Sequence, residues 1–110
     1  MARDTSDLLR GTLDLLVLKA LSAQPLHGFG LSKWIEQRTR NELEIFDSAL
    51  YKALHRLEDV GAIAAEWGVS DNNRRAKYYS LTARGRQMLR TETATWKRYV
   101  SAVSGVLETA

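Results

Sequence analysis

Apolar residues recur at every third or fourth position over four stretches of the chain, which is the spacing of helices that bury one face. The first stretch runs from Leu8 to Leu21, and its regular part is predicted to begin at Thr12 because Gly11 disfavours a helix. The sequence SAQPLHG breaks this pattern, and the second stretch then runs from about Gly28 to Thr39. Two helices joined by a short connection are therefore predicted for the first third of the chain.

The third stretch is divided most clearly into two faces. Asp47 is predicted to cap the helix, because its carboxylate can accept from backbone N–H groups of the first turn, and Gly61 is predicted to end it. The predicted core face carries Leu50, Ala53, Leu54, Leu57 and Val60. The opposite side carries Ser48, Tyr51, Lys52, His55 and Asp59, with Arg56 at its edge. A helix divided in this way can pack with one side and bind with the other.

Alternating patterns predict three short strands. One is NELEIF, residues 41–46, which turns Leu43 and Ile45 inward. The other two surround Ile63–Trp67 and Lys77–Leu81 and form a hairpin whose polar turn lies within SDNNRRAK, residues 70–77. Beyond the hairpin, Thr82 is predicted to cap a long final helix. Its apolar seam advances by four and three residues in turn, through Leu89, Thr93, Trp96, Val100, Val103 and Leu107.

This order of elements is that of a winged helix-turn-helix, in which the third helix enters the major groove of DNA and the hairpin lies alongside. The predicted fold class is mainly α with a small β-hairpin. Residues 1–82 would form the winged helix-turn-helix domain, and residues 83–110 a long C-terminal dimerisation helix. The predicted DNA-contacting residues of the third helix are Ser48, Tyr51, Lys52, His55 and Arg56. Those of the wing are Asn72, Asn73, Arg74, Arg75 and Lys77. An alternative for Tyr51 is a packing residue with a wet hydroxyl.

The distribution of charge favours a polyanionic partner. The net charge is only +3, but from Arg74 to Arg98 eight basic residues face one acid, whereas residues 1–47 carry six basic and seven acidic residues. The alternative is a solvated helix and an exposed loop that is polar for solubility. Because the cationic turn follows a helix with a polar face, DNA contact is the favoured interpretation.

The amino-acid composition excludes several other classes of protein. The 110 residues suffice for one domain, and with 45% hydrophobic and 26% charged residues the composition is that of a globular protein. No cysteine is present, and the longest apolar run, near Leu13 to Leu18, is far short of a bilayer span, so a soluble, cytoplasmic protein without membrane association is expected. The two histidines, His27 and His55, have no catalytic or metal-binding partners at recognisable spacing. We expect no enzyme, no cofactor and no metal site.

The seam of the last helix predicts a homodimer. It extends beyond what a short winged domain could cover, and a large side chain such as Trp96 gains most from burial. Two-fold symmetry would set two third helices about one DNA turn apart, ~34 Å, on a palindromic operator. The alternative is that this helix folds back on its own domain.

The residues also resemble a known family. SALYKALHRLEDVGAI followed by AEWGVSDNNRRAKYYSLTARGR is similar to the PadR-like transcriptional regulators, and LHGFGLSKWI after the first helix fits as well. The resemblance runs from about Leu8 to Trp96, and the wing sequence is most similar to the short acidobacterial-type subgroup. It implies a dimeric DNA-binding regulator, usually a repressor relieved by a small molecule or another signal.

The resemblance further implies that the last helix packs against the first helix of the other subunit. The implied dimer interface consists of Leu9, Leu13, Leu89, Trp96, Val100, Val103 and Leu107. In some relatives a tryptophan at the place of Trp96 stacks on flat aromatic compounds, which makes Trp96 a candidate effector site for a small aromatic molecule; plain interface packing is the alternative. A winged domain that binds only other proteins is the alternative to the DNA-binding function as a whole.

Overall fold

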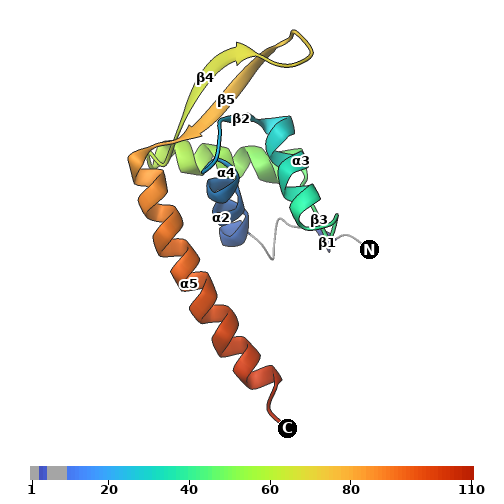
Figure 1. Cartoon of the computed structure of the whole chain (residues 1–110), viewed down its shortest axis with the longest axis vertical. Helices are drawn as coiled ribbons and strands as arrows, with labels where there is room; N and C mark the ends of the chain where they lie inside the picture. The colour runs from blue at the N-terminus through green and yellow to red at the C-terminus, as the bar shows by residue number, and fades with distance from the viewer. Residues whose placement is uncertain (1–2, 5–9) are drawn as a thin grey trace.

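The computed structural model of the chain describes residues 3–4 and 10–110, which form four helices around a small antiparallel sheet (Figure 1). In chain order the elements are β1 (Arg3–Asp4), α2 (Arg10–Ala20), β2 (Leu26–His27), α3 (Gly28–Arg38), β3 (Leu43–Glu44), α4 (Asp47–Asp59), β4 (Ile63–Val69), β5 (Arg75–Leu81) and α5 (Ala83–Leu107). This is the predicted winged helix-turn-helix with a long C-terminal helix.

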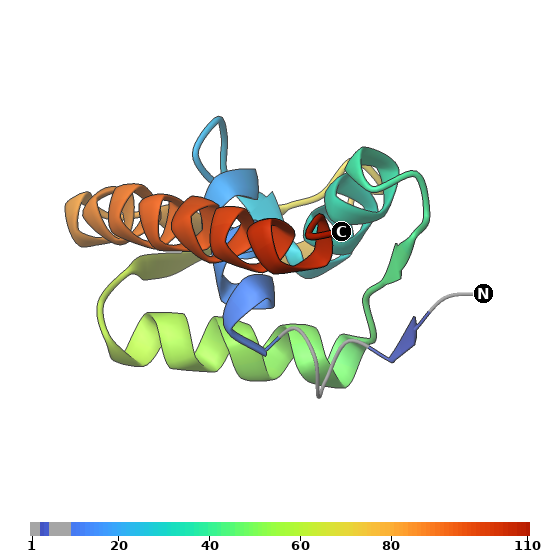
Figure 2. The ribbon, with the colours of Figure 1, turned by 90° about the horizontal axis from the view of Figure 1, so that it is seen from below.

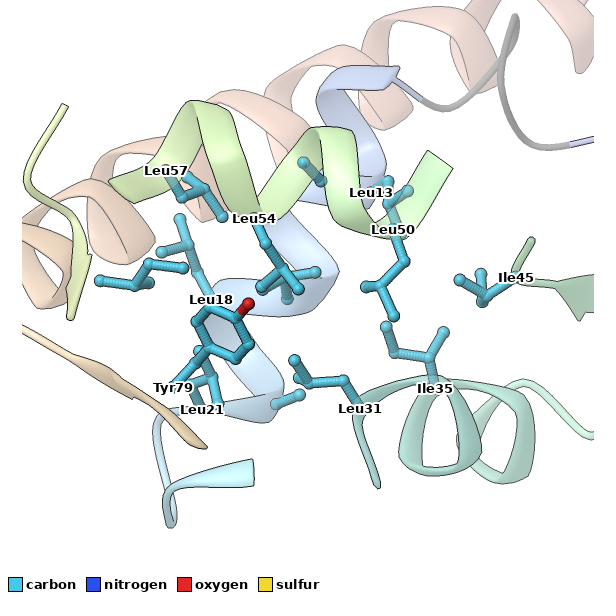
Figure 3. Close-up of a cluster of buried hydrophobic side chains, with 14 of the residues drawn as sticks. Leu13, Leu18, Leu21, Leu31, Ile35, Ile45, Leu50, Leu54, Leu57 and Tyr79 are labelled. Carbon is cyan, nitrogen blue, oxygen red and sulfur yellow. The ribbon is translucent and has the colours of Figure 1, made fainter. Parts of the chain in front are cut away.

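The core lies where α2, α3 and α4 meet the base of the sheet (Figure 3). Its large buried side chains are Leu13, Val17, Leu18, Leu21, Leu31, Ile35, Ile45, Leu50, Leu54, Leu57, Ile63 and Tyr79. The predicted core face of α4 is confirmed except at Val60, which is 44% exposed. Val60 follows the last helical residue as the C-cap, so the helical period no longer directs its side chain inward.

The two ends of α4 differ in how well the sequence predicted them. Gly61 adopts a φ of 76°, the left-handed conformation that ends many helices, as predicted. Asp47 is not the cap, because Phe46 occupies the N-cap position without a side-chain cap bond. Asp47 is instead the first helical residue, where its negative charge still interacts favourably with the helix dipole.

The start of α3 depends on a side chain that the sequence analysis left unassigned. His27 is the N-cap, and its Nδ1 accepts a hydrogen bond from the backbone N–H of Gly30 at 2.9 Å. The helix then ends at Arg38, with Thr39 as C-cap, close to the predicted boundary. In the first helix the prediction was late, because α2 already includes Gly11 and begins at Arg10.

The sheet contains one strand that the sequence did not predict. β4 and β5 form the expected antiparallel hairpin, with Trp67 opposite Lys77, but β5 also pairs with β2 on its other side. β2 comprises only Leu26 and His27, within the segment expected to be a break between helices. The predicted strand near Leu43 exists as β3, and it pairs in parallel with β1.

The last helix leaves the domain after its first turns. Thr82 caps α5 as predicted, since its Oγ1 accepts from the N–H of Gly85 at 3.1 Å, and Met88 and Leu89 pack against the core. α2 contacts both α4 and α5, and Figure 2 shows one end of α2 next to α4 with α5 crossing in front of it. Farther on, α5 projects away from the wing, and Trp96 is 40% exposed (Figure 1). Within one chain, α5 therefore does not fold back on its own domain.

None of the helices in residues 10–110 combines the length and the apolar character that a membrane span requires.

Candidate nucleic-acid interface

The polar face of α4 is exposed along its length. Ser48, Tyr51, Lys52 and His55 are all exposed, and they lie on the side opposite Leu50, Leu54 and Leu57 of the core. Hydroxyl, ammonium and imidazole groups on successive turns of one helix can donate to and accept from base edges or phosphates. The helix thus presents a continuous polar surface, while its buried face packs against the core and fixes its position.

Arg56, also predicted to contact DNA, is engaged within the subunit. Its Nη2 donates to Asp14 Oδ1 at 2.7 Å and its Nε donates to Asp14 Oδ2 at 3.3 Å. Both side chains are less than a third exposed, and this two-point geometry is the strong form of a carboxylate–guanidinium pair. Arg56 therefore joins α4 to α2, which is a role in positioning the helix.

Tyr51 is held against the beginning of α3. A Cβ atom at Gly28 would lie 2.5 Å from the Tyr51 hydroxyl oxygen, so the tyrosine ring occupies space that only a glycine leaves open. About half of the Tyr51 side chain is still exposed. Tyr51 therefore packs in part against α3, and the exposed part of the residue can still meet a ligand.

The wing ends in a tight turn formed by residues 70–74. The N–H of Ser70 donates to the carbonyl of Arg74 at 2.8 Å, and the N–H of Asn73 donates to the carbonyl of Ser70 at 2.9 Å. Asn73 adopts a φ of 60°, a conformation that asparagine tolerates better than most residues. The turn leaves Asn72, Asn73, Arg74 and Arg75 exposed at the tip, as the sequence predicted.

Besides Arg74, the wing carries the cations Arg75 and Lys77, and each of these two has a neighbour within the subunit. The Arg75 guanidinium lies over the Trp67 ring, with its Cζ atom 4.3 Å from the ring centroid. Lys77 Nζ lies 3.8 Å from Glu58 Oε1 of α4, so this predicted wing contact also connects the wing to the helix. A partly exposed pair of this kind contributes little stability, and Lys77 can exchange it for another anion.

Wing, α3 and α4 enclose an open groove of about 570 Å³, which we call the wing groove. Its lining includes His27, Gly28 and Phe29 of α3 and its cap, Tyr51 of α4, and Trp67, Asp71, Asn72, Arg74, Arg75, Lys77 and Tyr79 of the wing. His27, Phe29 and Trp67 were not predicted from the sequence to belong to this surface. For Trp67 a signal was present, since the alternation of the hairpin sets its side chain on the same face as those of Lys77 and Arg75.

Tyr79 lies at the base of this surface. Burial raises the pKa of the Tyr79 hydroxyl above its ordinary value of 10.0, and the nearby charges of Glu58 and Tyr51 raise the pKa further. Tyr79 therefore remains a neutral packing group at physiological pH.

The predicted dimer interface is divided by the structure. Trp96, Val100, Val103 and Leu107 are exposed along α5, and Leu89 is half-buried against the core. Leu13 is only 2% exposed, so this part of the prediction is corrected: its side chain fills the core of its own subunit. Leu9 lies outside the described residues.

Among residues 10–110 no three histidine, cysteine or acidic side chains come together to hold a metal ion. His27 Nδ1 is occupied by the cap of α3, and His55 stands on the exposed face of α4.

Comparison with known proteins agrees with this geometry. Residues 17–91 match the family model described as the transcriptional regulator PadR-like family. An uncharacterised protein from Lysinibacillus sphaericus is 36% identical over 92 residues, which cover 83% of this chain and 84% of that protein.

Two solved structures share both fold and sequence with the chain. A PadR family transcriptional regulator from Eggerthella lenta is 35% identical with a TM-score of 0.79, covering 94% of this chain and 88% of the other. A transcriptional regulator from Clostridium thermocellum is 27% identical with a TM-score of 0.82, covering 94% and 97%. These matches confirm the predicted fold and the prediction that the protein is a regulator rather than an enzyme. With a family match over more than half of its length, the chain belongs to the PadR-like family of transcriptional regulators.

Proposed function

We propose that this DNA-binding regulator acts as a homodimer that inserts one α4 helix per subunit into successive major grooves of a palindromic operator. The observation that carries the proposal is that Tyr51, on the polar face of α4, lines the same groove as Arg74 and Arg75 at the cationic tip of the wing. Such a surface can contact base edges with the helix and phosphates with the wing at the same time.

Within this proposal the base-reading residues are Ser48, Tyr51, Lys52 and His55, and the wing residues Asn72, Asn73, Arg74, Arg75 and Lys77 contact the sugar–phosphate backbone or the minor groove. Arg56 is left out, because its donors are bonded to Asp14. Arg56 therefore positions the helix, and the exposed residues next to it read the bases of the DNA.

Dimerisation through α5 is favoured by the apolar surface that one chain leaves uncovered. The helix has 25 residues, about 37 Å, and Trp96, Val100 and Val103 are each roughly 40% exposed on its distal half. A second copy of the helix, together with surface of α2, would bury this seam, whereas a monomer would leave it in water. In this arrangement residues 83–110 form the dimerisation element and residues 1–82 the DNA-binding domain.

Repression is the simplest consequence of such binding, because a dimer that covers one to two turns of DNA blocks access to the same site. Release would follow from a signal that changes the spacing of the two α4 helices. Trp96 and Tyr99 form an aromatic pair with centroids 6.1 Å apart at the proposed interface. A small aromatic compound that stacks on this pair would act directly on that spacing.

Selection of bound duplexes from a randomised pool, followed by titration of the selected duplex, tests the proposal. Lys52→Ala and His55→Ala should change the preferred sequence while leaving the oligomeric state intact. Arg74→Ala with Arg75→Ala should weaken binding to every duplex and flatten its dependence on salt. If the purified chain bound no duplex at low ionic strength, a winged domain that binds other proteins would replace this function.

A further inference from the structure

Trp67 is an exposed residue of the wing whose indole ring contacts the guanidinium of Arg75. Its side chain is 57% exposed on β4 and does not belong to the core. In the hairpin register Trp67 lies opposite Lys77 and Val69 lies opposite Arg75, so Trp67 and Arg75 are diagonal neighbours on one face of the sheet. The Arg75 Cζ atom lies 4.3 Å from the Trp67 ring centroid.

This contact distinguishes the two wing arginines. Arg74 belongs to the turn, and among the described residues no ion pair or ring contact of its guanidinium is found. Arg75 is the first residue of β5, where the ladder fixes its backbone and the indole restricts its side chain. A guanidinium that lies over a ring can still donate through the N–H groups at its edge, because these groups lie in the plane of the guanidinium. The ammonium group of a lysine has no such planar set of donors.

The pair borders the wing groove, and the charge there selects an anion. Arg74, Arg75 and Lys77 line the groove together with a single acid, Asp71. His27, which caps α3, and Tyr51 of the proposed reading face also line this groove. If α4 lies in the major groove, the backbone strand beside that groove comes close to the wing, and its phosphates can meet Arg75.

We propose that Trp67 is a positioning residue for DNA binding, which holds Arg75 at the wing groove so that its N–H edge meets a backbone phosphate. The inference rests on the proposed function and adds a role for a residue without charge. Because the indole restricts the side chain before DNA arrives, less rotamer freedom is lost on binding. Its contribution to affinity must then depend on Arg75.

A double-mutant cycle on the full chain measures this dependence, with a labelled duplex chosen by selection and dissociation constants determined by fluorescence anisotropy. Arg75→Ala should weaken binding about tenfold and reduce the salt slope by about one. Trp67→Ala should weaken binding about two- to fivefold with an unchanged salt slope, because the number of cations stays the same. In the Arg75→Ala background, Trp67→Ala should cost nothing further.

Two variants separate positioning from a general effect on the hairpin. Trp67→Phe keeps an aromatic face and should restore part of the affinity lost in Trp67→Ala. Val69→Ala removes an exposed apolar side chain from the same face of the same strand and should bind as the wild type does. Losses from Trp67→Ala and Arg75→Ala that simply multiply, or an equal loss from Val69→Ala, would overturn the inference. A wild-type chain that binds no duplex would instead overturn the proposed function, and this role of Trp67 with it.

Discussion

The Arg56 guanidinium of α4 is bound at two points by the Asp14 carboxylate of α2, with N···O distances of 2.7 and 3.3 Å. The pair joins the proposed reading helix to the helix behind it, across 42 positions of sequence. Because both side chains are partly buried, loss of one partner leaves the polar atoms of the other with fewer hydrogen bonds. The pair therefore fixes the orientation of α4 and does not add to its exposed face.

Replacement of Arg56 by alanine is expected to lower the free energy of unfolding by about 1 to 3 kcal/mol, because Asp14 is left without its donors. Arg56→Lys should recover part of this loss, since it restores the charge without the two-point geometry. Lys52→Ala, one turn earlier on the exposed face, is the control and should change stability by less than about 0.5 kcal/mol. Urea unfolding at one fixed chain concentration measures all three. Equal stability of Arg56→Ala and the wild type would show that the pair has no structural role.

Gly85→Ala is expected to destabilise the fold by about 2 kcal/mol or more. A Cβ atom there would overlap the backbone carbonyl oxygen of Ala62, so the first turn of α5 would have to shift. Gly105→Ala in the same helix is the control, because a Cβ atom there meets no described atom within 4 Å. It should leave stability unchanged or raise it by up to about 1 kcal/mol. Thermal unfolding followed by circular dichroism compares the two, and similar effects at both glycines would refute the close contact.

His27→Ala should lower the free energy of unfolding by about 1 kcal/mol, because the N–H of Gly30 loses its acceptor. His27→Asn supplies another side-chain acceptor at the same N-cap and should retain most of the stability. Urea unfolding distinguishes them. The cap assignment fails if alanine and asparagine at position 27 give the same stability.

The raised pKa of Tyr79 predicts that the folded chain loses stability at alkaline pH. Because its pKa is raised in the folded chain, its hydroxyl stays neutral there while the unfolded chain ionises near pH 10. Below that pH both states are neutral and this group adds no pH dependence; above it the unfolded state binds fewer protons, so the free energy of unfolding falls. Tyr79→Phe should reduce this fall, and Tyr99→Phe, at an exposed tyrosine of α5, should not. Denaturant unfolding from pH 8 to pH 11 provides the comparison.

Periodicity predicted the elements whose burial follows a single simple pattern. The division of α4 into Leu50, Leu54 and Leu57 on one side and Lys52 and His55 on the other was visible in the sequence, because one neighbouring layer covers the helix. The hairpin and the Thr82 cap were equally clear, since turn residues and caps act over a few positions. Sequence rules that act over a few positions are sufficient where the structure of a segment depends on contacts within that segment.

The remaining features depend on contacts between distant parts of the chain. β2 is a strand only because β5 lies beside it, and Leu13 is a core residue only because α4 and α5 both cover α2. The pairing of Arg56 with Asp14 likewise required knowledge of how two helices cross. For the candidate interface, sequence patterns identified the polar helix and the cationic turn, whereas the wing groove and the Trp67–Arg75 contact follow from the tertiary arrangement.

Sedimentation of the full chain with a labelled duplex from the selection experiment, at low ionic strength and micromolar concentration, tests the central claim most directly. We expect two 12.4 kDa chains to sediment with each duplex. Truncation of the chain before Trp96 should abolish this stoichiometry of two chains per duplex. One chain per duplex, or a duplex that sediments alone, would contradict a dimer that reads DNA with paired α4 helices.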